Sequence, residues 1–432
     1  MSPAIIGIIG IIIFLVLIFL GMNIGLALLI VGFVGYATIL DPAAAIGMLR
    51  KVPATQASTY ALIVIPLFIM MGNFAFHAGM SSNLYKAGHA WLSRVPGSLA
   101  ASTVAASAGF GAICGSCAAT CATMGTIALP EMRKYGYADR LSTGSIAFGG
   151  TLGILIPPST PMIIYCIMAE ESIGKQFIAG ILPGIMLALL GIATIAIMVK
   201  LKPSIAPTPT RSSWRERLVT LKGLWGVVVL FGVVLGGMFS GFFSVNQAAA
   251  IGAFLAIVLC VVNRTLNRET FRTAMKDTVK TFAMMFLIVI GASVFSSFLA
   301  VTKMPLALAD ALQSVDLSFG VVLIIMTIIY IILGMLMDEL PMIMLTVPIF
   351  LPIVESYGVN FVWFGIYIIL VMELGAIAPP VGLNCFIIQG IAKDISLGSI
   401  YKGALPFVIT ILVGIVLIYF FPQIVLVLPN LL

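Results

Sequence analysis

Residues 149–160 read GGTLGILIPPST, and residues 372–384 read MELGAIAPPVGLN. Each apolar stretch places two adjacent prolines four residues after a glycine. Proline has no backbone N–H, so the pair interrupts the hydrogen bonds of a helix. Lipid cannot satisfy the carbonyls that are freed, so they must face protein, water or an ion. The sequence predicts two broken membrane helices, at 141–168 and 360–388. A plain proline kink is the simpler alternative, but the same break in both halves favours an ion or substrate role.

The composition excludes a soluble protein. The 432 residues are 61% hydrophobic and 9% charged, whereas soluble domains contain about 25% charged residues. Apolar runs of about 20 residues recur without alternation, which indicates membrane helices rather than barrel strands. We therefore expect an all-α polytopic membrane protein. Besides the two broken helices, its spans are expected at 3–20, 24–40, 59–77, 176–199, 224–240, 247–263, 281–300 and 398–421.

Two further apolar segments, 99–130 and 318–354, are too long for one span and poorly shaped for two. Small or polar residues interrupt both in the middle. These are Gly115 and Ser116 in the first segment, and Asp338, Glu339 and Pro341 in the second. Both segments are predicted to be re-entrant helical hairpins.

The two halves resemble each other at an offset of about 222 residues. LPEMRKYGY at 129–137 matches LPIVESYGV at 351–359, and GILIPP at 153–158 matches GAIAPP at 375–380. Each half holds five spans and one hairpin, and the odd number of spans turns the second copy upside down. Inverted repeats with broken helices are typical of secondary transporters. The predicted division is a first repeat at 1–200, a basic cytoplasmic linker at 201–223 containing Pro209 and Arg211, and a second repeat at 224–432.

The charge distribution predicts the orientation. The net charge of +7 reflects loops that set topology rather than a nucleic-acid surface. With both termini periplasmic, 18 of the 22 Lys and Arg residues lie on the cytoplasmic side, as the positive-inside rule requires. The four that lie outside are Arg50, Lys51, Lys175 and Lys303.

Three carboxylates, Asp338, Glu339 and Glu373, lie in apolar sequence. A charge at the centre of a membrane helix costs about 2.5–3.5 kcal/mol on the mildest scale. Each carboxylate therefore either touches an ion or substrate, or is kept by a wet cavity or a structural pairing. There is no nucleophile beside a base and no phosphate loop. The six cysteines are expected to pack as small residues, so an intramembrane enzyme is disfavoured.

Several motifs together resemble one family. They are GAICGSCAATCATMG at 111–125, FSGFFSVNQAAAIGA at 239–253, LGMLMDELPMIMLTVPIFLPI at 333–353 and the two broken stretches. The chain resembles the large permease subunit of tripartite ATP-independent periplasmic (TRAP) transporters over nearly its whole length. It departs from that family at Cys114 and Cys117, where serine is common. It departs again at 244–247, which read SVNQ where Thr-Pro-Thr-Glu is common.

The resemblance implies sodium-coupled uptake of an organic acid, such as a dicarboxylate, across the bacterial inner membrane by an elevator movement. It implies a small four-helix membrane subunit and a periplasmic binding protein as partners, and no cofactor besides sodium ions. The sodium sites would involve Gly115, Ser116, Gly150, Thr151, Asp338, Gly375, Gly382 and Asn384. The substrate would lie near Ser116, Thr120, Pro158, Ser159 and Pro380, with Glu373 as a further candidate. The alternative is a stand-alone ion-coupled anion transporter or exchanger of related hairpin architecture that needs no binding protein.

Overall fold

The computed structural model describes residues 2–208, 212–314 and 317–431, so Pro209 and Arg211 of the predicted linker lie outside it. Helices are the only regular secondary structure in these three ranges. The first half contains α1 (Pro3–Phe19), α2 (Ile24–Ile39), α3 (Pro42–Ser58), η1 (Tyr60–Ile63), α4 (Val64–His77), α5 (Met80–Leu92), α6 (Ser98–Cys114), α7 (Cys117–Lys134), α8 (Asp139–Leu155), α9 (Thr160–Ala169) and α10 (Ile173–Leu201).

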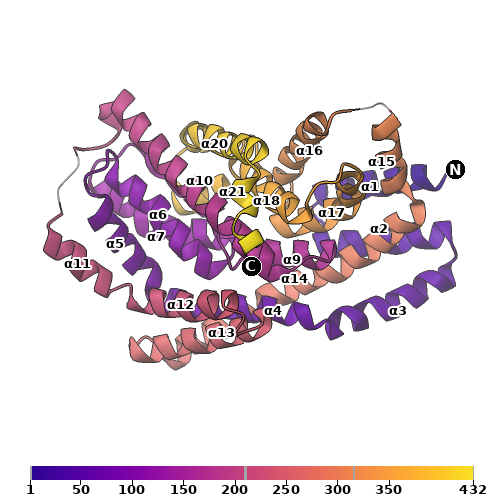
Figure 1. Cartoon of the computed structure of the whole chain (residues 1–432), viewed down its shortest axis with the longest axis horizontal. Helices are drawn as coiled ribbons and strands as arrows, with labels where there is room; N and C mark the ends of the chain where they lie inside the picture. The colour runs from indigo at the N-terminus through magenta and orange to yellow at the C-terminus, as the bar shows by residue number, and fades with distance from the viewer. Residues whose placement is uncertain (1, 209–211, 315–316, 432) are drawn as a thin grey trace.

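The linker contains η2 (Pro203–Ile205) and α11 (Trp214–Lys222). The second half contains α12 (Trp225–Phe239), α13 (Val245–Val262), α14 (Arg268–Thr302), α15 (Met304–Ser314), α16 (Phe319–Gly334), α17 (Glu339–Ser356), α18 (Phe361–Ile377), α19 (Leu383–Ile391), α20 (Leu397–Phe420), α21 (Gln423–Leu426) and η3 (Pro429–Leu431). Figure 1 shows this order along the chain.

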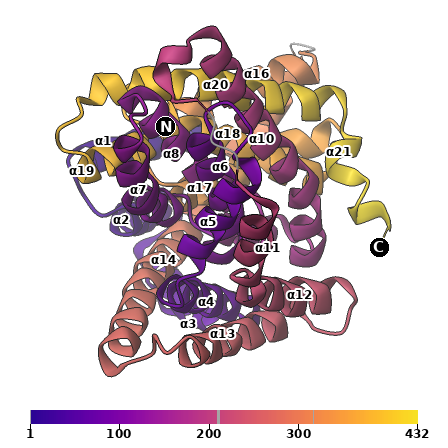
Figure 2. The ribbon, with the colours of Figure 1, turned by 90° about the vertical axis from the view of Figure 1, so that its left-hand side faces the viewer.

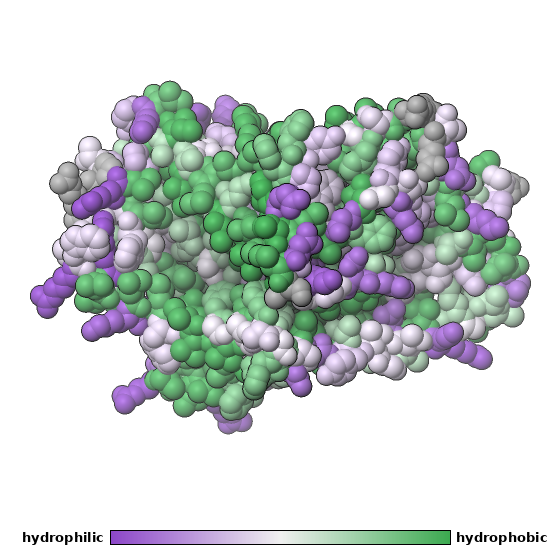
Figure 3. All heavy atoms as spheres, viewed as in Figure 1, coloured by the Kyte–Doolittle hydropathy of each residue, from purple (hydrophilic) through white to green (hydrophobic). Residues whose placement is uncertain are grey.

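The helices are suited to a membrane. Among the described residues, six are long and apolar enough to cross one, and the number rises to eight if each of two bent pairs counts as one span. Large apolar side chains such as Leu20, Leu201 and Phe242 are more than three-quarters exposed. Figure 3 shows hydrophobic residues covering much of one face, with hydrophilic residues at its margins and in a group across the middle of its right half. Such a surface is expected to lie against lipid.

The helices form two groups. In Figure 2, α3, α4, α12 and α13 lie together below most of the other helices. The long helix α14 packs against α2, α3 and α4, and α13 packs along α4. The other group contains both hairpins and both broken helices, with α8 packed against α6, α7, α18 and α20.

The predicted hairpins and broken helices are confirmed as helix pairs. The first hairpin is α6 and α7, and the second is α16 and α17; the broken helices are α8 with α9 and α18 with α19. The α8–α9 pair bends by 40° at its break. Each half thus runs through a hairpin, a broken helix and a long helix in the same order.

A pair of glycines marks the same contact in each half. A Cβ on Gly153 of α8 would lie 2.8 Å from the Ser116 carbonyl oxygen, and the Cα of Gly153 faces Gly111 of α6. A Cβ on Gly375 of α18 would lie 2.9 Å from the Cα of Gly334 at the end of α16. Only glycine allows these close approaches, so both hairpins seat their first arm directly on the broken helix that follows.

Within the described residues, five α-helices lie outside the predicted spans and hairpins: α3, α5, α11, α15 and the four-residue α21. Their sequences are mixed rather than uniformly apolar, so hydropathy alone does not reveal them. For example, α3 begins after Asp41, whose carboxylate accepts the Ala44 N–H at 2.8 Å, and buries only Ala45. The helix expected at 281–300 extends back to Arg268, because Asn267 caps a polar segment that precedes the apolar one.

Candidate functional site

The tip of the first hairpin is a sharp turn between two helices. Gly115 ends α6 with a φ of +63°, a left-handed conformation that favours glycine. Ser116 then caps α7: its Oγ accepts the Ala119 N–H at 3.4 Å, and its carbonyl accepts the Thr120 hydroxyl at 2.7 Å. The predicted helix break at Gly115 and Ser116 is confirmed.

The first broken helix meets this tip. Residues 156–159 separate α8 from α9, and the buried Ser159 caps α9 by accepting the Met162 N–H at 3.4 Å. The Thr160 N–H points to the Gly115 carbonyl at 3.5 Å, and a Cβ on Gly115 would lie 2.8 Å from the Pro158 carbonyl oxygen. The N-termini of α7 and α9 therefore lie side by side. Each carries the partial positive charge of a helix start, which favours an anionic group.

In the second hairpin, the residue that caps the second helix is charged rather than neutral. Asp338 lies 222 residues after Ser116 and holds the same N-cap position, at the start of α17. Its Oδ1 accepts the N–H of the next residue, Glu339, at 2.9 Å, whereas Ser116 accepts the N–H three residues on. Asp338 and Glu339 line a small cavity together with Ile154 of α8, Met372 of α18 and Leu383 of α19. Two adjacent carboxylates beside both breaks favour a cation at this tip.

Asn384 of α19 joins the second half to the first. Its Oδ1 accepts the Cys117 thiol at 3.2 Å, its backbone carbonyl accepts the Cys121 thiol at 3.6 Å, and its Nδ2 donates to the Ala147 carbonyl at 2.9 Å. A Cβ on Gly150 would lie 2.9 Å from that Nδ2 and 2.6 Å from the Cys121 Cβ. Asn384 and Gly150, two predicted sodium ligands from opposite halves, are thus in contact.

Glu373 is fully buried in α18, and neither of its carboxylate oxygens has a hydrogen-bond partner among the described residues. The Thr151 side chain of α8 lies beside it; the Thr151 hydroxyl itself donates to the Phe148 carbonyl at 2.8 Å. An ionised carboxylate without a partner is costly inside a protein. Glu373 and Thr151, predicted from separate halves, therefore lie together.

Pro380 has surroundings different from those of Pro158. It is exposed, and the Tyr401 hydroxyl of α20 donates to its carbonyl and to that of Val381. Gly382, which follows with a φ of +56°, precedes the first turn of α19. The carbonyls of Pro380 and Val381, at the second break, are therefore satisfied within the second half.

The cysteines were expected only to pack, and their hydrogen bonds were missed. Cys117 and Cys121 are one helical turn apart on α7, and both thiols donate to Asn384. The i, i+4 spacing places both on one face of the helix. That spacing was the available signal, but the partner on α19 lies 267 residues from Cys117.

Charged residues tie the far end of the first hairpin to the loop after α19. Arg133 of α7 pairs with Asp394 at 2.6 Å and with Asp139 at 3.3 Å. The hydrogen bond from Arg133 lowers the pKa of the Asp394 carboxyl. All three side chains are at least one-third exposed, so these pairs orient the segments more than they stabilise them.

The sequence profile of the tripartite ATP-independent periplasmic transporter, DctM component, matches residues 11–424. The chain belongs to this family. It is 34% identical over 373 residues to the C4-dicarboxylate TRAP transporter large permease protein DctM of Pseudomonas aeruginosa, covering 86% of each chain. It is also 29% identical to the sialic acid TRAP transporter large permease protein SiaM of Vibrio cholerae, covering 96% of each.

The DctM family membership makes this chain a multi-pass membrane protein and a transporter permease subunit, not an enzyme. The fold is shared more widely. The YdaH transporter of Alcanivorax borkumensis, whose structure is described as having an unusual topology, superposes with a TM-score of 0.64 at 15% identity. The match covers 98% of this chain and all of that one.

Proposed function

We propose that this permease imports small organic acids in symport with sodium ions, receiving them from a periplasmic binding protein and working beside a small four-helix membrane subunit. The observation that carries the proposal is the convergence of both hairpin tips and both helix breaks, with Asn384 joining the halves. The relatives named for C4-dicarboxylates and sialic acid, both organic acids, support the substrate class.

The substrate carboxylate would bind where α7 and α9 begin. Ser116 and Ser159 are uncharged caps, so the positive ends of the two helices are not neutralised there. Thr120 and Pro158 border the same place. Pro380 and Glu373 would contribute to the same substrate site from the second half.

Sodium ions would bind where carbonyls and acidic side chains gather. In the first half, Gly115, Ser116, Gly150 and Thr151 supply carbonyl or hydroxyl oxygens, which hard cations prefer. In the second half, Asp338, Gly375, Gly382 and Asn384 do the same. Asp338 adds a full negative charge at the equivalent of Ser116. An anion site and a cation site side by side would make each ion favour the binding of the other.

The movement would be an elevator. The moving group would hold α6–α9 and α16–α19, and the stationary group would hold α2–α4 and α12–α14. The separation of α3, α4, α12 and α13 in Figure 2 supports this division. The chain would lie in the bacterial inner membrane with both termini periplasmic, consistent with its distribution of Lys and Arg.

Uptake into proteoliposomes tests the proposal. The chain would be reconstituted with its small subunit, and labelled organic acids offered with or without an inward sodium gradient and with or without the binding protein. We expect uptake only when both are present. Uptake that persists without the binding protein, or that follows a proton gradient alone, would instead indicate a stand-alone exchanger.

A further inference from the structure

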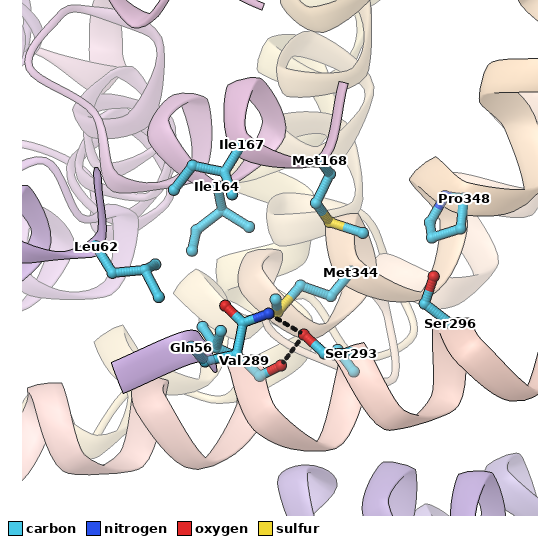
Figure 4. Close-up of a pocket in the computed structure, with 11 residues that line it drawn as sticks. Gln56, Leu62, Ile164, Ile167, Met168, Val289, Ser293, Ser296, Met344 and Pro348 are labelled. Atoms are coloured by element: carbon cyan, nitrogen blue, oxygen red, sulfur yellow. Dashed lines mark hydrogen bonds between the residues drawn. The ribbon is translucent and has the colours of Figure 1, made fainter. Parts of the chain in front are cut away.

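A cavity of about 290 Å³ separates the two helix groups. One wall is formed by α3, η1 and α14, and the other by α9 and α17 (Figure 4). Figure 4 shows Ile164 and Met168 on the opposite side from Ser293 of α14. The volume is at the lower end of the range for small-molecule pockets, about 300–1,000 Å³.

The lining is mainly apolar and contains no charged residue. Its polar groups come from one wall. The Gln56 Nε2 donates to the Ser293 Oγ at 2.9 Å, and that hydroxyl donates to the Val289 carbonyl at 2.8 Å. The Gln56 Oε1 and the Ser296 hydroxyl make no hydrogen bond to other described residues, so they can pair with a ligand. A charged ligand would lose its hydration here without a counter-charge.

We propose that this cavity binds a small uncharged amphiphile, in its simplest form an aliphatic alcohol. The ligand hydroxyl would pair with Gln56 and Ser296, and the alkyl chain would lie among Ile164, Met168 and Met344. Methionine side chains adapt to ligands of different shape. Each added methylene should raise the affinity about fourfold until the cavity is full.

The site has a consequence for transport that rests on the proposed function. If α9 and α17 move against α3 and α14, a molecule wedged between them must leave before each crossing. Bound alcohol should therefore slow uptake without competing with the substrate. Binding itself does not depend on this movement.

Binding is tested by photolabelling. Proteoliposomes would be irradiated with a diazirine-bearing octanol, and labelled residues identified by mass spectrometry. We expect label on Ile164, Met168 or Met344, displaced by 1-octanol but at least tenfold less by octanoate. Ser296→Leu should remove the label, whereas Ser297→Leu, on the next position of α14, should keep it. Label spread over lipid-facing helices, or unchanged by Ser296→Leu, would overturn the site.

Uptake measurements then test whether an alcohol bound in the cavity slows transport. Inhibition by a series of 1-alkanols should strengthen with chain length to a cut-off, and Ser296→Leu should move the cut-off to shorter chains. Site-specific labelling with no effect on uptake would refute the claim that bound alcohol slows transport, but the binding site itself would stand. If the native protein shows no sodium-dependent uptake, the proposed function fails, and photolabelling still decides the site.

Discussion

At the residue scale, Asn384 links the two halves through hydrogen bonds to Cys117 and Ala147, which lie 267 and 237 positions away in the sequence. Asn384→Ala would leave the Cys117 thiol without its acceptor and would remove the second hydrogen bond of the Ala147 carbonyl, which lies within α8. An unsatisfied buried polar group costs about 1–3 kcal/mol, so we expect a lower melting temperature and weaker sodium dependence of uptake. Asn430→Ala, at an exposed position, is the control. Unchanged melting and sodium response in Asn384→Ala would remove its bridging role.

Asp338 is the charged counterpart of Ser116. Asp338→Asn keeps the shape and the capping oxygen but removes the charge, so the amount of protein in the membrane should not change. We expect at least tenfold more sodium for half-maximal uptake, because a neighbouring negative charge stabilises a bound cation. Asp310→Asn, on the exposed side of α15, should have no effect. Native sodium dependence in Asp338→Asn would exclude Asp338 from the ion site.

His89 of α5 gives the stability a pH dependence. Burial lowers the pKa of its imidazole, and the nearby carboxylates of Glu131 and Glu216 oppose this only in part. A group with a lowered folded pKa favours folding above its unfolded pKa, about 6.5. The contribution is lost as the pH falls below that value. We expect melting temperatures to fall between pH 7.5 and 5.5, and to fall less in His89→Gln. An equal fall in His89→Gln and the native chain would refute this, with His77→Gln as the control.

At the scale of elements, the two glycine contacts are the clearest equivalence between the halves. In both Gly153→Ala and Gly375→Ala, the new methyl group would meet a neighbouring helix at less than 3.0 Å. Overpacking of this kind costs about 1–3 kcal/mol, so both variants should melt at lower temperature. Gly236→Ala in α12 has open space around its Cβ and should be neutral or slightly stabilising. Equal melting of all three would mean that these contacts are not tight.

The sequence predicted the elements that carry a strong local signal. Adjacent prolines, Gly115 with Ser116, and the 222-residue offset locate both hairpins and both breaks to within a few residues. Helices such as α3 and α5 were missed because they lie outside the apolar runs. The contact between Cys117 and Asn384 and the surroundings of Glu373 were also missed. They depend on how distant helices pack, which no local pattern encodes.

At the scale of the whole molecule, the proposed elevator requires that two groups of helices move against each other. Ser293 of α14 faces Met344 of α17 across the cavity between the groups, while Gln56 of α3 contacts Ser293 within the stationary group. A covalent link across the cavity should stop transport, but a link within one group should not.

The most direct measurement is uptake by two double-cysteine variants before and after cross-linking with a short thiol reagent. Ser293→Cys with Met344→Cys should lose at least nine-tenths of its uptake and regain it on cleavage of the link. Gln56→Cys with Ser293→Cys should keep its uptake when linked. Normal uptake by the linked Ser293–Met344 variant would contradict the elevator, because transport would then proceed while the two walls of the cavity stay joined.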